Sequence, residues 1–357
     1  MLIVRSPVRI SFGGGGTDLP GYYSRFGGAV LSTSINKYFY TILQKRSDGQ
    51  IQVISSDLRL METWHDMSRM DVNRSELAIP LAAIQEIGLD ISVDLFLASE
   101  IGVGTGLGSS ASVCVGVLKT LATYLDLPFS KYELAEQAFH IARTVLGKPV
   151  GKQDEYAAAF GGLNFISFHS DGSTSVEPID LSLADLRELE ANLMLFFTGV
   201  AHDSWTLLQE QERTTGPGGG SEVEPLHEAR RIADDMRRAL IKHDLRSFGA
   251  LLHDGWEAKK RVSSHISTPL IDEAYALARE NGTLGGKIAG AGGGGFLLLF
   301  CAQKDQAKVR GALARIGLKE MTFGLDFQGV AVVTNDPFID SDEKCGTRWT
   351  LAPAISY

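Results

Sequence analysis

Alternating hydrophobic and polar positions in the first part of the chain predict short β-strands. Stretches rich in β-branched and aromatic residues, a composition typical of strands, lie at residues 8–12, 38–44, 51–54 and 91–97. The Asp-Gly pair within residues 47–50 predicts a hairpin between the second and third stretches. Residues 161–168 and 175–179 predict another strand pair, joined at Asp171 and Gly172.

Apolar residues spaced three and four positions apart predict helices in both halves of the chain. These helices are expected at residues 80–87, 111–125, 131–146, 204–212, 225–242, 245–261, 269–280 and 304–316. The fifth has one apolar stripe, formed by Leu226, Ala229, Ala233, Met236 and Leu240. Later strands are expected at residues 193–198, at either end of 287–300 and at 329–334.

This mixture favours an α+β fold with two domains, at residues 1–180 and 181–335, followed by a polar tail at residues 336–357. A chain of 357 residues with 44% hydrophobic and 22% charged residues is long enough for two cores. The net charge of −9 argues against a nucleic-acid partner, although a local basic cluster can still bind an anionic substrate.

The cysteines and the apolar runs indicate where the protein works. The three cysteines, Cys114, Cys301 and Cys345, are too scattered for a disulfide or zinc framework, and the first two are expected to be buried thiols in a reducing compartment. No secretory signal is visible, and no apolar run approaches the roughly 20 residues that span a bilayer. We therefore expect a cytoplasmic protein with no membrane partner.

A glycine-rich bend leading into a helix is the strongest chemical signal in the chain. It consists of Gly104, Thr105, Gly106, Leu107, Gly108, Ser109, Ser110, Ala111 and Ser112. Glycines let the backbone approach a phosphate, and a helix start carries free N–H groups and partial positive charge. The bend therefore predicts a nucleotide phosphate site. The alternative is an ordinary glycine turn followed by a serine-capped helix.

Three further segments carry candidate chemistry. Gly13 to Asp18 follow a predicted strand. Four successive glycines suit a rigid polyol that lies against the backbone, with Asp18 accepting hydrogen bonds from its hydroxyl groups; the alternative is a mobile loop. Asp154 stands at a predicted helix start, where it could take a hydroxyl proton or simply favour the helix dipole. Residues 285–295 form another glycine loop, or a plain hairpin turn. A strand follows this loop, which argues against a dinucleotide fold.

Together and in this order, the segments resemble the GHMP superfamily of small-molecule kinases. Residues 9–20 and 151–162 look most like the branch that phosphorylates D-glycero-D-manno-heptose 7-phosphate. The resemblance implies an N-terminal domain like ribosomal protein S5 domain 2, a ferredoxin-like C-terminal domain and an active site between them. It also implies ATP and Mg²⁺ as cofactors.

Carried over by position, the resemblance assigns a role to each segment. Gly104 to Ser112 would hold the triphosphate, with Ser109 or Ser110 binding Mg²⁺. Asp154 would be catalytic and paired with Arg9, which would neutralise charge in the transition state. The substrate would be bound by Gly14, Gly15, Gly16, Thr17, Asp18, Lys152, Gln153, Lys259, Lys260, Gly290, Gly292 and Gly293. Ala142 stands where many members carry a Mg²⁺-binding glutamate.

A phosphorylated acceptor needs cations at its far end. Lys259 to Arg261, beside Trp256, are the first candidates, followed by His202 and Lys152; the alternative is a solvated helix end. The expected reaction is ATP-dependent phosphorylation of the anomeric hydroxyl of D-glycero-D-manno-heptose 7-phosphate to the 1,7-bisphosphate, for nucleotide-activated heptose and surface polysaccharide. A fucose, arabinose or uronic acid 1-kinase, or a non-catalytic nucleotide or sugar sensor, remains an alternative. A homodimer is possible.

Overall fold

The computed structural model describes residues 1–65, 71–88, 92–102, 104–199, 209, 223–261, 263 and 265–336. The helix expected at 204–212 lies, apart from residue 209, outside the described residues. So do His202, Cys345 and the expected tail after residue 336. Within the described part of the chain, no helix is both long enough and apolar enough to cross a membrane. Cys114 and Cys301 are buried free thiols, as expected.

The larger sheet has eight strands, most of which the alternating pattern predicts. They are β1 (Leu2–Gly13), β2 (Gly28–Lys45), β3 (Ile51–Ser55), β4 (Leu60–Trp64), β5 (Val93–Ser99), β6 (Leu163–Phe168), β7 (Thr174–Pro178) and β12 (Ala331–Asn335). The main order is β12-β1-β2-β5-β3-β4, and β6 joins β2 to β7. β12 pairs antiparallel with β1, so the end of the expected 181–335 domain is a strand of the first sheet.

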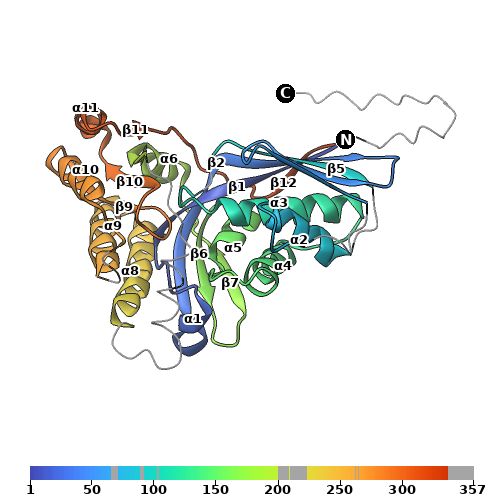
Figure 1. Cartoon of the computed structure of the whole chain (residues 1–357). Coiled ribbons are helices and arrows are strands. Elements are labelled where there is room, and N and C mark those ends of the chain that lie inside the picture. Colours follow the sequence, from blue (N-terminus) through green and yellow to red (C-terminus); the bar gives the residue numbers. More distant parts are fainter. Residues whose placement is uncertain are drawn as a thin grey trace, which may run out of the picture.

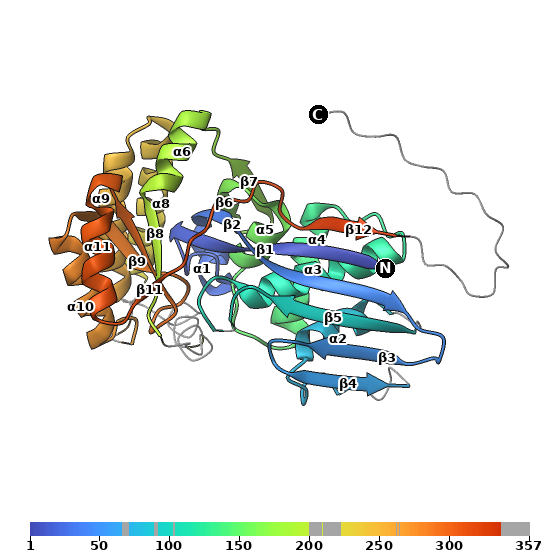
Figure 2. The same cartoon turned by 90° about the horizontal axis from the view of Figure 1, so that it is seen from above.

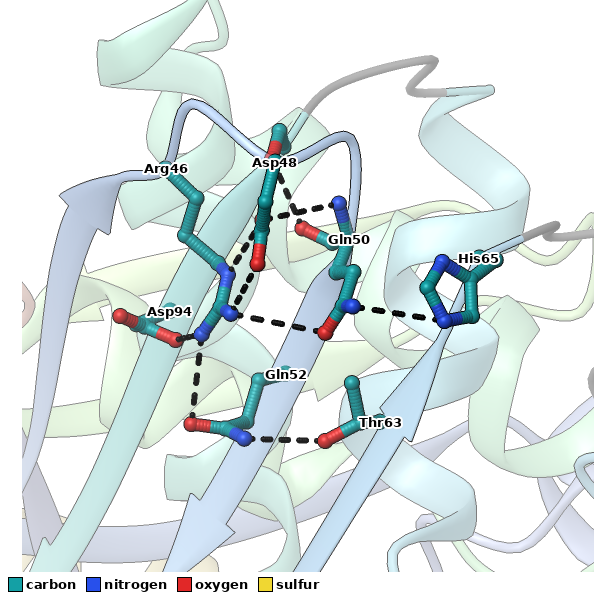
Figure 3. A network of polar contacts seen from close by, with 8 residues as sticks. Arg46, Asp48, Gln50, Gln52, Thr63, His65 and Asp94 are labelled. Atoms are coloured by element: carbon teal, nitrogen blue, oxygen red, sulfur yellow. Dashed lines mark hydrogen bonds and ion pairs between the residues drawn. The ribbon is translucent and has the colours of Figure 1, made fainter.

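The hairpin expected at residues 47–50 is wrong, because β5 lies between β2 and β3. β5 is antiparallel to β2 and parallel to β3. Arg46, directly after β2, links the turn that follows it to β5 (Figure 3). Its guanidinium donates to Asp48 in the turn at 2.9 Å and to Asp94 on β5 at 2.5 Å. The same network extends through Gln52, which donates to Thr63 on β4 at 2.9 Å.

Helices cover one face of this sheet (Figure 1). They are α2 (Ala78–Ile87), α3 (Ser109–Tyr124), α4 (Lys131–His140) with a π-helical turn at Ile141–Val145, and α5 (Gln153–Phe160). α3 packs on β1 and β2, and its buried face joins strand residues such as Val4 and Leu95 in one hydrophobic core. A short helix, α1 (Pro20–Phe26), connects β1 to β2. This packing fixes the start of α3 beside β1.

The second sheet lies beyond one end of β1 and has the order β11-β8-β10-β9 (Figure 2). Its elements are α6 (Leu183–Asn192), β8 (Leu193–Phe197), α8 (Glu224–Ile241), α9 (Leu245–Lys260), α10 (Pro269–Glu280), β9 (Thr283–Ile288), β10 (Phe296–Cys301), α11 (Gln303–Arg315) and β11 (Lys319–Glu320). The predicted stripe of α8 is buried except at Ala229, which is half-buried. Its members Ala233, Met236 and Leu240 share a core with Ile10 and Phe12 of β1, and this core joins the two sheets.

Candidate active site

Arg9 and Asp154 form the central ion pair of the site. Arg9 Nε donates to Asp154 Oδ1 and Arg9 Nη2 to Asp154 Oδ2, both at 2.7 Å. β1 positions the arginine, and the first turn of α5 positions the carboxylate. The arginine is buried, whereas the carboxylate keeps 27% of its surface exposed. The pair is therefore rigid and bidentate, with a carboxylate that another molecule can still reach.

The glycine-rich bend is held against this pair. Arg9 Nη1 donates to Gly106 O at 2.5 Å, and the Arg9 N–H donates to Leu107 O at 2.9 Å. Gly104, Gly106 and Gly108 all have φ near +75°, between 73° and 80°. A Cβ at Gly108 would lie only 3.2 Å from Asp154 Oδ2. The left-handed backbone conformation explains the alternating glycines. Because Gly108 has no side chain, the Asp154 carboxylate can lie directly beside the bend.

α3 begins at Ser109, so the free N–H groups of its first turn open onto the bend. Ser109 Oγ is buried and has no hydrogen-bond partner among the described residues, while Ser110 is exposed. The Ser112 hydroxyl already has structural partners. It donates to Pro7 O at 2.7 Å, with Gly108 O at 3.2 Å as a second acceptor, and so ties α3 to β1, while its expected role in ATP binding stays a prediction.

The glycine loop after β9 interlocks with the bend, backbone against backbone. A Cβ at Gly106 would lie 2.4 Å from Ala289 O, and one at Gly290 would lie 2.6 Å from Gly106. Gly292 and Gly293 are buried, and Gly293 donates to Ile266 O at 2.8 Å. These two glycines therefore pack within the loop, and their expected contact with substrate stays a prediction.

Asp18 lies on the other side of Asp154 and is buried. Its Oδ1 accepts the Gly16 N–H at 2.9 Å, and its Oδ2 accepts Gln153 Nε2 at 3.0 Å. Burial raises the pKa of Asp18, and the nearby Asp154 charge raises it further. Gln153 precedes Asp154 on α5, so the first turn of this helix links residues 13–18, called the acceptor loop below, to the ion pair.

Gly14 and Thr17 hold the acceptor loop in shape. The Thr17 hydroxyl donates to Gly14 O at 2.7 Å and accepts the Ala29 N–H at 3.0 Å. Both residues are buried. Thr17 therefore ties the loop to the neighbouring strand, and the expected contact of both residues with substrate stays a prediction.

Two lysines bring positive charge to the junction of the loops. Lys287, at the end of β9, is 6% exposed and donates to Phe12 O at 3.3 Å. Burial, together with Arg9, lowers its pKa to about 8. Lys259 on α9 donates to Gly290 O. Burial lowers its pKa well below the usual value, and the charges of Lys287 and Arg9 lower it further. These mutual effects show that three cations lie near one another.

Two other predicted lysines point elsewhere. The Lys152 ammonium is 4% exposed and donates to both Glu136 oxygens, at 2.7 and 2.9 Å, and to Gly172 O at 2.8 Å. Lys260 pairs with Glu257 at 2.9 Å, on the side of α9 that carries the Trp256 ring. Both lysines have structural partners, and their expected contact with substrate stays a prediction.

Sequence reasoning gave no separate role to two residues near the ion pair. By the resemblance, residues 287–295 are expected to close over the transferring phosphate, which places Lys287 in this loop but does not single out its charge. A lysine near the end of a buried strand, just before a glycine loop, is itself a signal. Glu155, next to Asp154, is 3% exposed, and its Oε2 has no hydrogen-bond partner among the described residues. Burial raises its pKa well above the usual value, and the Asp154 charge adds to this effect.

Ala142 lies in the π-helical turn and offers no carboxylate. Among the described residues, no three acidic, histidine or cysteine side chains gather as a metal site. The buried, unpartnered Ser109 hydroxyl is the group that fits a Mg²⁺ ion here, because it faces no competing acceptor and oxygen is the ligand Mg²⁺ prefers.

Comparisons with known proteins agree with this geometry. The chain matches the family models of the GHMP kinases N terminal domain over residues 77–162 and the GHMP kinases C terminal domain over residues 236–317. The D-glycero-alpha-D-manno-heptose 7-phosphate kinase of Campylobacter jejuni is 33% identical over 301 residues, 83% of this chain and 88% of that protein.

Two more relatives are similar over most of the chain. The L-fucokinase/L-fucose-1-P guanylyltransferase of Bacteroides fragilis is 26% identical over 334 residues, 86% of this chain and 35% of that protein. The crystal structure of a D-glycero-D-manno-heptose 1-phosphate kinase from Bacteroides thetaiotaomicron has a TM-score of 0.78 at 27% identity, covering 94% of this chain and all of its own. The two-domain fold class is confirmed. The chain belongs to the GHMP kinases and is an ATP-dependent sugar kinase.

Proposed function

We propose that this kinase transfers the γ-phosphoryl group of ATP to the anomeric hydroxyl of D-glycero-D-manno-heptose 7-phosphate and forms the 1,7-bisphosphate. One observation carries the proposal: Asp154 adjoins both the phosphate-binding bend, at Gly108, and the acceptor loop, through Gln153 and Asp18. The relatives from Campylobacter jejuni and Bacteroides thetaiotaomicron, whose names specify heptose phosphates, support this acceptor.

The site residues divide the reaction among them. Asp154 accepts the proton of the anomeric hydroxyl while the oxygen of that hydroxyl bonds to the γ-phosphorus of ATP. The bond from that phosphorus to the β–γ bridging oxygen then breaks, and ADP leaves. Arg9 orients Asp154 and, with Lys287, neutralises charge on the moving phosphoryl group. Mg²⁺ bound through Ser109 would neutralise charge on the outer phosphates.

Lys259 supports a phosphorylated acceptor. Its ammonium has no carboxylate partner among the described residues and instead donates to Gly290 O. A cation beside two others is unfavourable until an anion joins it. The phosphate of the sugar supplies that charge, in addition to the phosphates of ATP.

Measurement of ADP release across a panel of acceptors tests the proposal. The panel contains heptose 7-phosphate, the unphosphorylated heptose, fucose, arabinose and a uronic acid. We expect the highest kcat/KM for heptose 7-phosphate. Lys259→Met should lower kcat/KM for this sugar far more than for the unphosphorylated heptose. Lys260→Met, on the neighbouring position, is the matched control and should behave like the wild type.

A second acceptor class is favoured by one finding. The similarity to the L-fucokinase of Bacteroides fragilis extends over 86% of this chain. A higher kcat/KM for fucose than for heptose 7-phosphate, unaffected by Lys259→Met, would replace the heptose proposal with a 1-kinase for an unphosphorylated sugar.

A further inference from the structure

Most glycines of the acceptor loop are required by the fold itself. Gly14 has φ +85°, and a Cβ there would lie 1.9 Å from Ala29 O. Gly16 has φ +92°. A Cβ at Gly13 would lie 2.9 Å from Met236 Sδ. Left-handed backbone or a close neighbour therefore accounts for the missing side chain at each of these three positions.

Gly15 is different, because nothing in the fold requires a glycine there. Its φ is not positive, and a Cβ would meet only Gln153 Nε2 and Ser11 Oγ, each at an ordinary contact distance of 3.8 Å. Gly15 is also half-buried, whereas residues 11–14 and 16–19 are buried. A methyl group would therefore fit here in ordinary contact with both of these polar side chains.

The two polar side chains beside Gly15 have unused hydrogen-bonding capacity. Ser11 is 4% exposed, and its Oγ has no hydrogen-bond partner among the described residues. Gln153 Oε1 is also buried and unpartnered within the described part of the chain, while Nε2 of the same amide donates to Asp18. A buried polar atom without a hydrogen-bond partner destabilises the protein. A ligand that pairs with both atoms would remove this cost.

Strand geometry places Ser11 on the catalytic side of β1. Side chains two residues apart along a strand share a face, so Ser11 lies on the face that carries Arg9. Ile10 and Phe12, on the opposite face, are in the hydrophobic core that joins the two sheets. The Ser11 hydroxyl therefore points to the same side as the ion pair, next to the acceptor loop.

We propose that Ser11 Oγ and Gln153 Oε1, the two unpartnered atoms beside Gly15, bind neighbouring hydroxyl groups of the acceptor sugar. This inference rests on the proposed function, since it requires a polyol acceptor. Asp18 fixes the amide of Gln153, because one carboxylate oxygen accepts the Gly16 N–H and the other accepts a hydrogen bond from Gln153 Nε2, which leaves Oε1 without a partner. Ser11 can donate or accept, so the pair matches two hydroxyls on adjacent carbons.

Acceptor kinetics of Gly15→Ala and Ser11→Ala test the inference. The added methyl of Gly15→Ala should raise KM for the acceptor about tenfold or more, with an unchanged melting temperature and an unchanged KM for ATP. Ser11→Ala should raise the acceptor KM about 3- to 10-fold, as expected for one hydrogen bond. Gly311→Ala, on α11 with no atom within 4 Å of its Cβ, is the matched control. Gly14→Ala should lower the melting temperature instead.

Deoxy acceptors give a second readout. A sugar that lacks the hydroxyl bound by Ser11 should be a poor substrate for the wild type, and Ser11→Ala should no longer discriminate against it. The inference would be overturned, and the proposed function would stand, if Gly15→Ala and Ser11→Ala both kept the wild-type KM for the acceptor. The same holds if Ser11→Ala discriminated against every deoxy sugar as the wild type does. Absence of ADP release by the wild type with every sugar would overturn the proposed function as well.

Discussion

Asp154 combines two properties that a proton acceptor for a hydroxyl group needs. Both of its oxygens are held by Arg9, so its orientation is fixed before the substrate binds. Yet 27% of the side chain stays exposed, so one face remains open to the acceptor. A carboxylate that served only to cap α5 would not need a buried arginine 145 positions away in the chain.

Replacement of Asp154 by asparagine keeps the size of the side chain but removes the proton acceptor. We expect turnover to fall by about 10²- to 10⁴-fold, the usual contribution of general acid–base catalysis. ATP affinity, measured by calorimetry, should stay close to that of the wild type, because the phosphate-binding bend is untouched. A near-normal kcat would remove Asp154 from this role.

Glu155 makes a separate contribution, to stability. Its pKa is raised in the folded protein, so its stabilising effect is present below the usual pKa of 4.5 and is lost as the pH rises toward the folded value. Glu155→Gln removes this titration. We expect the variant to melt a few degrees above the wild type at pH 7 and at the same temperature as the wild type near pH 4. A variant that melts lower at pH 7 would show that the carboxylate has an unrecognised partner.

At the scale of elements, α4 begins with a complete capping box. Ser130 Oγ accepts the Glu133 N–H at 3.2 Å, and the Glu133 carboxylate accepts the Ser130 N–H at 2.7 Å. Ser130→Ala should therefore lower the free energy of unfolding by about 1 kcal/mol. Urea denaturation measures this loss, and kcat should be unchanged because the cap lies outside the site. An unchanged unfolding free energy would mean that water replaces the cap.

Local patterns predicted most elements but not how they pair. Periodicity identified α8 and β6 because an amphipathic helix or strand is encoded within its own residues. It could not show that β5 separates β2 from β3, because the choice of strand neighbours depends on packing far along the chain. The helix α6 was also missed, although Ser182, which accepts the Asp185 N–H at 3.1 Å, is a recognisable start signal.

The same distinction applies to the site. The phosphate-binding bend around Gly106 and the pairing of Arg9 with Asp154 could be expected from the sequence, because these residues lie in segments that resemble motifs of a known family. The roles of Lys152 and Ser112 could not, since either side chain can reach a structural partner or a ligand from the same backbone position. The structure gives both a structural partner.

At the scale of the whole molecule, Lys287 joins the two sheets across the site, from β9 to Phe12 on β1. Its pKa in the folded protein, about 8, is below the usual 10.5. Between these two pH values the unfolded chain binds more protons than the folded protein, so stability rises with pH. Lys287→Met should stabilise the ligand-free protein at pH 7 by up to about 3 kcal/mol, at about 1.36 kcal/mol per pKa unit.

Calorimetric unfolding at pH 7 and above pH 10.5 checks this prediction, because the difference between Lys287→Met and the wild type should disappear at the higher pH. Lys287→Met should also gain less thermal stability from added ATP than the wild type does, since it lacks the cation. Equal ATP-induced shifts would show that the lysine does not contact the nucleotide phosphates.

The pairing of β12 with β1 also bears on biosynthesis. Residues 331–335 are made long after residues 2–5, the segment of β1 that they pair with. While the nascent chain leaves the ribosome, the N-terminal strand that carries Arg9 therefore keeps one edge without its partner, and such an edge is prone to pair with other chains. A translation arrest shortly before residue 331 should leave a product that aggregates more readily than the released protein.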